Sequence, residues 1–341
     1  MKKLLQTLYG LLLICSCIWL LGFIWVHQWG GLWLTIVFTI LWVGSLFALY
    51  WIKHKKIDQQ RYAHFSYWFF FFVVVVIFFC MKPSNDRDWA PEVAKIMTFR
   101  FVDGQVEIDN VRNFIWKSQD EYTTQWETRR YDLEKLDQVD LVVSHFIPGP
   151  VAHAFISFGF DNGERLAFSL EVRQEKGEGF STVGGFFRQY ELALVVGDEN
   201  DVIYTRSNTR DEDVYVYPIQ MQKIEIQMLF LEYLNQANRL NNKPRWYNTL
   251  LSNCTTILFD LTEHATGSVP RDYRVVLPGL LPNYLYDYKQ LDHQFSLDEW
   301  KHKAHVNPKT ENLKNGPDGL DVPFSELIRK DLPAVKNKAM P

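Results

Sequence analysis

Three long stretches without charged side chains dominate the N-terminal quarter of the chain. Residues 4–25 and 30–51 contain no Asp, Glu, Lys or Arg, and neither do residues 62–81, where His64 is the sole basic group. An α-helix needs about 20 apolar residues to cross the roughly 30 Å of hydrocarbon in a bilayer. The first stretch lacks a small-residue cleavage site and two more follow it, which argues against a cleaved signal peptide. We therefore expect residues 1–83 to form a transmembrane anchor of three helices.

The short loops beside these stretches predict the orientation of the anchor. Lys2 and Lys3 precede the first stretch, and residues 53–61, between the second and third, contain three lysines, one histidine and one arginine. Residues 26–31, between the first and second, contain no Lys or Arg. Cytoplasmic loops are the ones enriched in Lys and Arg. We therefore expect a multi-pass protein of the inner (cytoplasmic) membrane with a cytoplasmic N-terminus. The chain from Asn85 onward is then periplasmic, or extracytoplasmic in an organism without a periplasm.

The rest of the chain is long enough for one sizeable folded domain and an extension. Alternating segments predict strands, and the apolar periodicity of residues 221–240 predicts a helix that packs on them. We expect an α+β domain with a mainly antiparallel sheet at residues 84–265, then an extension at residues 266–341 that packs on the domain or the membrane surface. A formal net charge of −4 argues against a nucleic-acid partner. No pair of histidines has convincing metal-ligand spacing, and we expect no metal or cofactor.

Cys254 is the one cysteine outside the apolar stretches, and its neighbours indicate a reactive thiol. Exported domains usually keep cysteines in disulfide pairs, so a single cysteine suggests a free thiol. Ser252 and Asn253 are good N-cap residues, and apolar residues recur at helical spacing after them, which puts Cys254 in the first turn of a helix. There the helix dipole and unpaired N–H groups favour a thiolate and could stabilise an oxyanion. The alternative is a buried structural cysteine without chemistry.

Residues 151–160 and 165–173 alternate between apolar and other side chains, and they flank the turn sequence Asp-Asn-Gly at 161–163. This pattern predicts a β-hairpin. A three-residue loop with Gly163 in the left-handed conformation keeps both apolar faces on one side of the sheet, whereas a two-residue Asn-Gly turn would mix them. The preferred register pairs Phe158 with Leu166 and Ile156 with Phe168.

The same register places His153 directly opposite Glu171 on the other face of the hairpin. Cross-strand Cβ atoms lie about 5 Å apart, so the carboxylate could hold the imidazole in place. A thiolate nucleophile needs an imidazole base beside it and a third group that orients the base. Cys254, His153 and Glu171 are thus the candidate nucleophile, base and orienting group. The alternative is that His153 and Glu171 form a solvent-facing pair on an exposed sheet.

A histidine on one strand, a polar residue on the next and Asn-Cys at a helix start resemble the permuted papain-like cysteine enzymes of the NlpC/P60 type. More closely, residues from about 86 to about 264 resemble the DUF4105 family, also called the Lnb N-terminal periplasmic domain after a bacterial lipoprotein N-acyltransferase. The segments that carry this resemblance are Asp86–Trp89, Val111–Phe114, Arg130–Leu133, Ala152–Phe158, Phe168–Arg173, Tyr247–Thr249 and Asn253–Thr256. Together these segments are specific to the family, although each alone would be a weak signal.

The resemblance implies a papain-like fold in which a helix carries the nucleophile. It assigns Cys254 as the nucleophile, His153 as the base and Glu171 as the third member. The residues that we expect to support the substrate or the oxyanion are Asn253, Thr255, Tyr247, Arg173 and Arg112.

These inferences predict a membrane-anchored cysteine acyltransferase that moves an acyl chain from a phospholipid, through a Cys254 thioester, to an amine. The resemblance suggests the N-terminus of a lipoprotein as the acceptor, since nothing in the residue pattern selects an amine over water. One alternative is a cell-wall peptidase or amidase, or a (thio)esterase, on the same scaffold; an amidase or peptidase would show an open polar groove beside Cys254. Another is a non-enzymatic membrane scaffold or sensor, for which changing Cys254 to Ala would leave the phenotype intact.

Overall fold

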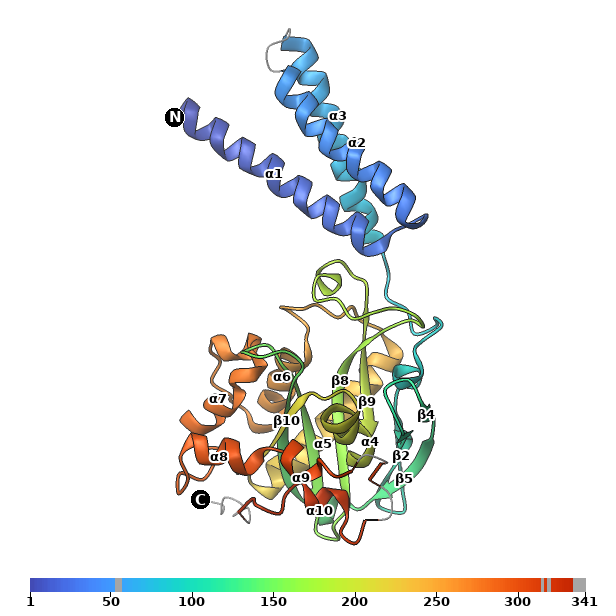
Figure 1. Cartoon of the computed structure of the whole chain (residues 1–341), viewed down its shortest axis with the longest axis vertical. Coiled ribbons are helices and arrows are strands. Elements are labelled where there is room, and N and C mark those ends of the chain that lie inside the picture. The colour runs from blue at the N-terminus through green and yellow to red at the C-terminus, as the bar shows by residue number, and fades with distance from the viewer. Residues whose placement is uncertain (53–56, 314–315, 318–319, 334–341) are drawn as a thin grey trace. The chain divides into compact units, whose positions relative to one another are not determined.

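The computed structural model describes residues 1–52, 57–313, 316–317 and 320–333, and it divides into two compact units (Figure 1). The helical unit consists of residues 1–84 together with the segments 179–191 and 246–249. The sheet unit consists of residues 85–178, residues 192–245 and the chain from residue 250 onward. A boundary between units therefore falls near residue 84, and two later segments group with the N-terminal helices.

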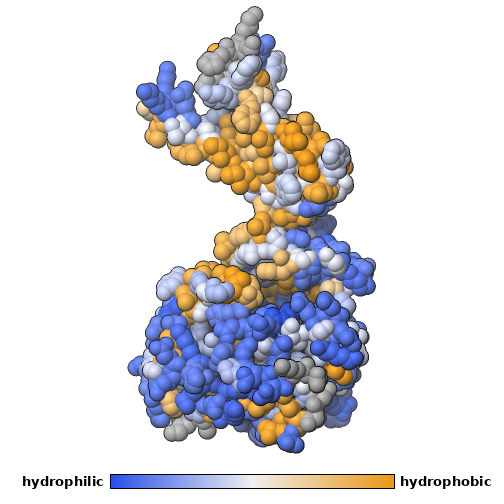
Figure 2. Space-filling view, viewed as in Figure 1, coloured by the Kyte–Doolittle hydropathy of each residue, from blue (hydrophilic) through white to orange (hydrophobic). Residues whose placement is uncertain are grey.

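Three helices form the N-terminal part of the helical unit: α1 (Lys2–His27), α2 (Gly31–Ile52) and α3 (Ile57–Cys80). Each is long and apolar enough to cross a membrane, where a helix satisfies its own backbone hydrogen bonds. Figure 2 shows apolar side chains on the surface of these helices. The three predicted helices are confirmed, with α3 starting before the predicted residue 62. Residues 53–56, which contribute to the predicted orientation, lie outside the described residues.

The segment 179–191, which includes the short 3₁₀ helix η3 (Gly184–Phe186), packs against these helices. Phe187 covers Gly22 of α1, where an added Cβ would lie 2.5 Å from the phenyl ring. The carbonyl oxygen of Phe187 accepts a hydrogen bond of 2.7 Å from Nε2 of His27. The missing side chain at Gly22 therefore makes room for this segment on the surface of α1.

An eight-stranded sheet forms the centre of the described part of the sheet unit. Its strands are β1 (Thr98–Val102), β2 (Gln105–Arg112), β5 (Trp126–Tyr131), β6 (Leu136–His145), β7 (His153–Phe160), β8 (Arg165–Arg173), β9 (Glu191–Gly197) and β10 (Asp213–Pro218). Their order is β1-β2-β9-β8-β7-β6-β10, with β5 also paired to β2. The pairs β1–β2, β2–β5, β6–β7, β7–β8 and β6–β10 are antiparallel, and β2–β9 is parallel.

Helices cover this sheet, and a two-stranded ribbon of β3 (Ile115–Trp116) and β4 (Tyr122–Thr123) lies beside it. The α-helices are α4 (Glu199–Tyr204), α5 (Lys223–Asn242), α6 (Cys254–Thr266), α7 (Leu281–Asp287), α8 (Leu297–Ala304), α9 (Asn307–Thr310) and α10 (Phe324–Leu327). A π-helical turn, η4 (Thr205–Thr209), continues α4. The 3₁₀ helices are η1 (Pro91–Val93), η2 (Leu133–Lys135), η5 (Tyr273–Val276) and η6 (Pro278–Leu280). The predicted α+β class with a mainly antiparallel sheet is confirmed.

The hairpin β7–β8 has the predicted register. Phe158 pairs with Leu166, and Ile156 pairs with Phe168. Gly163 has a φ of 86°, the left-handed conformation that the three-residue loop requires. The apolar face of the hairpin packs on α5, whose Phe230 ring lies 5.1 Å from that of Phe158.

The opposite face of the hairpin is covered as well. Phe155 and Ala167 belong to a buried cluster that includes Val202 and Ile203 of α4. His153 and Glu171 share this covered face, and their side chains are only 12% and 20% exposed. The alternative of a solvent-facing pair on an exposed sheet is therefore wrong.

The described part of the C-terminal extension packs on the sheet unit. Phe324 of α10 and the nearby Ile328 are buried. Arg329 forms ion pairs with Asp140 at 2.7 Å and Glu199 at 2.5 Å, and both carboxylates are buried. Because a buried carboxylate without a counter-charge is costly, Arg329 fastens the extension to the sheet.

Candidate active site

Cys254 is the first residue of α6, and the capping of this helix fixes its position. The side-chain oxygen of Asn253 accepts hydrogen bonds from the backbone N–H groups of Thr255 (3.0 Å) and Thr256 (2.8 Å). The backbone N–H of Asn253 donates to the Thr256 hydroxyl over 3.0 Å. This reciprocal cap is the one that the Asn-Cys-Thr-Thr sequence favours. The Cys254 side chain is buried, and its Sγ lies 3.7 Å from the Thr255 hydroxyl.

His153 begins β7, and two residues of β8 hold its imidazole. Nε2 of His153 lies 2.7 Å from Oγ of Ser169 and 3.3 Å from Oε1 of Glu171. The Ser169 hydroxyl donates to the same Oε1 over 2.6 Å. Residues two positions apart on a strand point to the same face, so both side chains reach the imidazole. The predicted contact between His153 and Glu171 is present, and Ser169 bridges it.

Arg206, from the π-helical turn η4, is a further member of this cluster, and it is buried. Its Nη2 donates to Oε1 of Glu171 over 2.7 Å, and its Nη1 donates to Oε2 of Glu212 over 3.1 Å. Glu212 also accepts a hydrogen bond from the Ser144 hydroxyl. π-Helical turns are rare in proteins, and those that occur often lie at functional sites. Glu171 is therefore held between an imidazole and a guanidinium.

The pKa of the Cys254 thiol is lowered from its ordinary value. Burial by itself raises this pKa, but the charge of the His153 imidazole and its hydrogen bond to the thiol lower it. The backbone N–H of Ala154 and the hydroxyl of Thr255 act in the same direction. A helix N-terminus also favours a thiolate. The nucleophilic form of Cys254 is thus stabilised by its surroundings.

The pKa of His153 is raised to about 9. Burial lowers this pKa, and the charge of Arg206 lowers it too, but the Glu171 carboxylate and Cys254 outweigh both. Burial would also raise the pKa of Glu171, yet His153 and Arg206 hold it well below its ordinary value. The site therefore favours a thiolate and an imidazolium next to an ionised carboxylate. Such a pair can attack a carbonyl carbon and then protonate the leaving group.

Two of the predicted support residues lie at this cluster. Asn253 caps α6, and the Thr255 hydroxyl contacts the thiol of Cys254. Tyr247 belongs to the helical unit, where its backbone N–H donates to the Tyr190 carbonyl over 2.9 Å.

The other two predicted support residues, Arg112 and Arg173, make structural contacts instead. Arg112 forms a two-pronged ion pair with the buried Asp201, at 2.7 and 2.9 Å. Arg173 lies over the Trp89 ring, with its guanidinium carbon 4.4 Å from the ring centre. Its three guanidinium nitrogens donate to the carbonyl oxygens of Val93 and Ala94 and to the side chain of Asn85. Both guanidinium groups bind protein acceptors, whereas the prediction gave these arginines a role in supporting the substrate or the oxyanion.

Sequence reasoning missed Ser169, Arg206 and Glu212. Ser169 lies in the segment that carries Glu171, and its position two residues earlier on the same strand face could have identified it. Arg206 and Glu212 lie in a polar segment without periodicity, between β9 and β10. No pattern there indicates that its arginine reaches β8.

Taken together, the fold and the site define a protein with three apolar helices and a mainly antiparallel sheet domain that buries a cysteine, a histidine and a carboxylate side by side. Residues 122–279 match the model of the protein family described as the Lnb N-terminal periplasmic domain. This match confirms the predicted family, and the chain contains a domain of that family. The matched range holds all the residues of the cluster, but it starts after the predicted segments 86–89 and 111–114. No curated protein and no solved structure matches the chain.

Proposed function

We propose that this protein is a membrane-anchored cysteine acyltransferase. The Cys254 thiolate attacks the carbonyl carbon of an acyl ester in a phospholipid, and the ester C–O bond breaks as the thioester forms. The His153 imidazolium gives its proton to the departing lysophospholipid oxygen. An amine then attacks the thioester carbonyl, the C–S bond breaks, and neutral His153 takes the amine proton. The proposed amine is the N-terminus of a lipoprotein.

The observation that carries this proposal is the protonation pattern of the buried cluster. The thiol pKa is lowered and the imidazole pKa is raised to about 9, so the resting site favours the thiolate and imidazolium that the first step uses. Three apolar helices in the same chain would keep this site close to phospholipid. A covalent intermediate divides the transfer into two steps, for which a cysteine is well suited.

The proposal includes a fold and a membrane arrangement. In it the sheet unit is a permuted papain-like domain with α6 as the nucleophile helix. The helices α1–α3 span the inner membrane with the N-terminus in the cytoplasm, which puts the sheet unit in the periplasm. The description of the matched family as a periplasmic domain supports this side of the membrane.

Two alternatives use the same residues differently. A cell-wall amidase or peptidase, or a (thio)esterase, would give the acyl group to water or cleave a peptide amide. The burial of Cys254, at 6% exposure, favours a lipid acyl group over a broad cell-wall polymer. A scaffold or sensor would make no use of an activated thiol, so the lowered pKa of Cys254 argues against it.

The test is the intact mass of the purified full chain after incubation with phospholipid vesicles. We expect a mass gain of one acyl chain that hydroxylamine removes, because hydroxylamine cleaves thioesters. The gain should be absent in Cys254→Ala. A variant with Cys15, Cys17 and Cys80 changed to Ser serves as the matched control and should keep the adduct. If no adduct forms while Cys254 is freely alkylated, the acyltransferase is rejected in favour of the amidase.

A further inference from the structure

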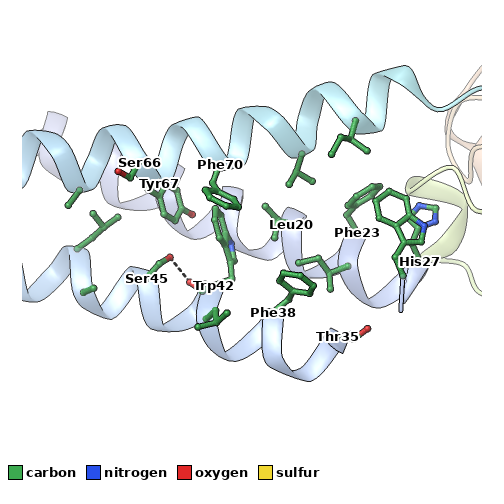
Figure 3. A pocket seen from close by; sticks show the side chains of 18 residues that line it. Leu20, Phe23, His27, Thr35, Phe38, Trp42, Ser45, Ser66, Tyr67 and Phe70 are labelled. Carbon is green, nitrogen blue, oxygen red and sulfur yellow. Dashed lines mark hydrogen bonds between the residues drawn. The ribbon is translucent and has the colours of Figure 1, made fainter. Parts of the chain in front are cut away.

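A groove runs along the three apolar helices of the helical unit (Figure 3). Its volume is about 550 Å³, which is in the range of pockets that hold small ligands. The side chains that line it along its length include Leu20, Phe38, Leu41, Phe70, Val74 and Ile77. With such a lining the groove suits a hydrocarbon chain.

A central set of contacts fixes the spacing of the helices at the groove. The rings of Trp42 (α2) and Tyr67 (α3) stack with centroids 4.6 Å apart. The Tyr67 hydroxyl lies 2.9 Å from Oγ of Ser16 on α1. All three side chains are buried. The stacked pair of Trp42 and Tyr67, together with the contact between Tyr67 and Ser16, thus connects all three helices. The groove beside these contacts is therefore bounded by specific packing of the helices.

One end of the groove is polar. His27 at the end of α1 and Thr35 in the first turn of α2 line it there, as Figure 3 shows. His27 donates to the carbonyl oxygen of Phe187, and the next residue in the chain is Arg188. This polar end therefore adjoins a basic residue of the segment 179–191.

Arg188 is held at the C-terminal end of α3. Its Nη1 donates to the carbonyl oxygens of Phe78 (2.7 Å), Phe79 (3.3 Å) and Met81 (3.3 Å), and its guanidinium carbon lies 4.4 Å from the centre of the Phe78 ring. Its backbone φ of 58° is left-handed, which is uncommon for a residue with a side chain. Among the described residues no carboxylate pairs with Arg188. A positive charge is thus fixed beside the end of an apolar groove without an anionic partner from the protein.

We propose that the helical unit binds one phospholipid, with an acyl chain in the groove and the phosphate beside Arg188. An acyl chain matches the apolar lining, and basic side chains at the ends of membrane helices bind lipid head groups. The bound lipid differs from ordinary surrounding lipid because its chain lies in a groove lined by all three helices. That this lipid is also the acyl donor rests on the function proposed above, whereas its binding does not.

The groove is tested by photocrosslinking of the full chain in vesicles of phosphatidylethanolamine and phosphatidylglycerol. The probe is phosphatidylglycerol with a diazirine in one acyl chain, and peptide mass spectrometry locates the label. We expect label on the groove residues Leu20 and Leu49, which are 2% and 6% exposed, in preference to the outward-facing Ile40 and Phe47, which are 66% and 71% exposed. Equal labelling of inward and outward residues would overturn the proposal, because it would mark ordinary surrounding lipid.

Two matched variants of α2 sharpen this test. Ser45 lines the groove, so Ser45→Phe should fill it and lower the labelling of groove residues about tenfold, equivalent to about 1.4 kcal/mol. Gly44→Phe is the control, because a Cβ on Gly44 meets no atom within 4 Å. The Gly44→Phe variant should be labelled by the probe to the same extent as the wild type. The same labelling in both variants would contradict the groove.

The phosphate contact is tested with Arg188→Gln. This variant should weaken labelling by the phosphatidylglycerol probe and leave labelling by a diacylglycerol with the same diazirine chain unchanged. An equal effect on both probes would refute the contact between Arg188 and phosphate.

Labelling in the Cys254→Ala variant separates this inference from the proposed function. Groove labelling that persists in Cys254→Ala, in a protein whose wild type forms no thioester, would leave the lipid site standing and reject the acyltransferase. Thioester formation without selective groove labelling would reject the lipid site alone.

Discussion

Removing the charge of Glu171 should change the pH dependence of Cys254 reactivity. Glu171→Gln keeps the shape of the side chain but removes the carboxylate that raises the pKa of His153 to about 9. Without it, burial and the charge of Arg206 both lower that pKa and only Cys254 still raises it, so we expect the His153 pKa to fall. Loss of the whole shift between the ordinary value of 6.5 and the value of about 9 would correspond to about 3 kcal/mol, at about 1.36 kcal/mol per pKa unit, and this is the upper limit of the effect.

The direction of the effect on the thiol follows from the same coupling. In the wild type, His153 is protonated below a pH of about 9, and its charge stabilises the thiolate of Cys254. In Glu171→Gln, His153 loses its proton at a lower pH than in the wild type, so above that pH its charge no longer offsets the burial of Cys254 and the thiol pKa rises. At neutral pH we expect the alkylation rate of Cys254 to fall, by at most about two orders of magnitude.

The assay is the rate of iodoacetamide alkylation between acidic and alkaline pH, followed by intact mass. It uses the protein with Cys15, Cys17 and Cys80 changed to Ser, so that the alkylation measured is that of the Cys254 thiol. Glu164→Gln is the matched control, because Glu164 is an exposed carboxylate at the tip of the same hairpin. It should react like the parent. A Glu171→Gln profile that overlays the parent profile would refute the electrostatic coupling between the carboxylate and the thiol.

Three further predictions concern stability. Arg329→Ala should destabilise the protein by about 3–5 kcal/mol, because it removes the ion-pair partner of the buried Glu199 and leaves the buried Asp140 with Arg165 alone, at 3.2 Å; an unchanged urea midpoint would contradict this. Burial would raise the pKa of Glu199, but Arg329 holds it at about 2 against an ordinary 4.5, so it contributes about 3 kcal/mol above pH 4.5 that is lost as pH falls toward 2. The acid limb of a denaturation curve checks this, since the loss should be absent in Glu199→Gln. Asn253→Ala removes the cap of α6 and should cost about 0.5–2 kcal/mol, measured by urea unfolding, and it should also slow alkylation of Cys254.

The parts of the site that the sequence predicts are those that local rules determine. The alternation of two strands and a turn with Gly163 define one register, and that register brings His153 to Glu171. Likewise Asn253 is a strong N-cap and places Cys254 at the start of a helix whatever the rest of the chain does. Each of these predictions needs only residues that are near in sequence.

The parts that sequence could not predict depend on contacts between distant segments. Arg112 and Arg173 lie in segments that carry the family resemblance, yet Asp201 and the 85–94 region take up their guanidinium groups. An arginine in a sequence does not show which acceptor it will meet. The sequence likewise does not show that the segments 179–191 and 246–249 group with the N-terminal helices. The second of these ends just before the loop that leads to Cys254.

Arg206 explains why the charge pattern of the site can persist. Burial by itself raises the pKa of Glu171, and a buried carboxylate made basic enough in this way could take the proton of His153, which would leave the thiolate without its cation. Arg206 donates to the same oxygen of Glu171 that faces His153, and His153 and Arg206 together hold the Glu171 pKa well below its ordinary value. The proton therefore stays on the imidazole, while Glu171 keeps the negative charge that raises the His153 pKa. Because Glu212 in turn pairs with Arg206, the buried guanidinium has two carboxylates and is itself stabilised. The chemistry of Cys254 thus depends on a residue of a rare π-helical turn that does not touch the thiol.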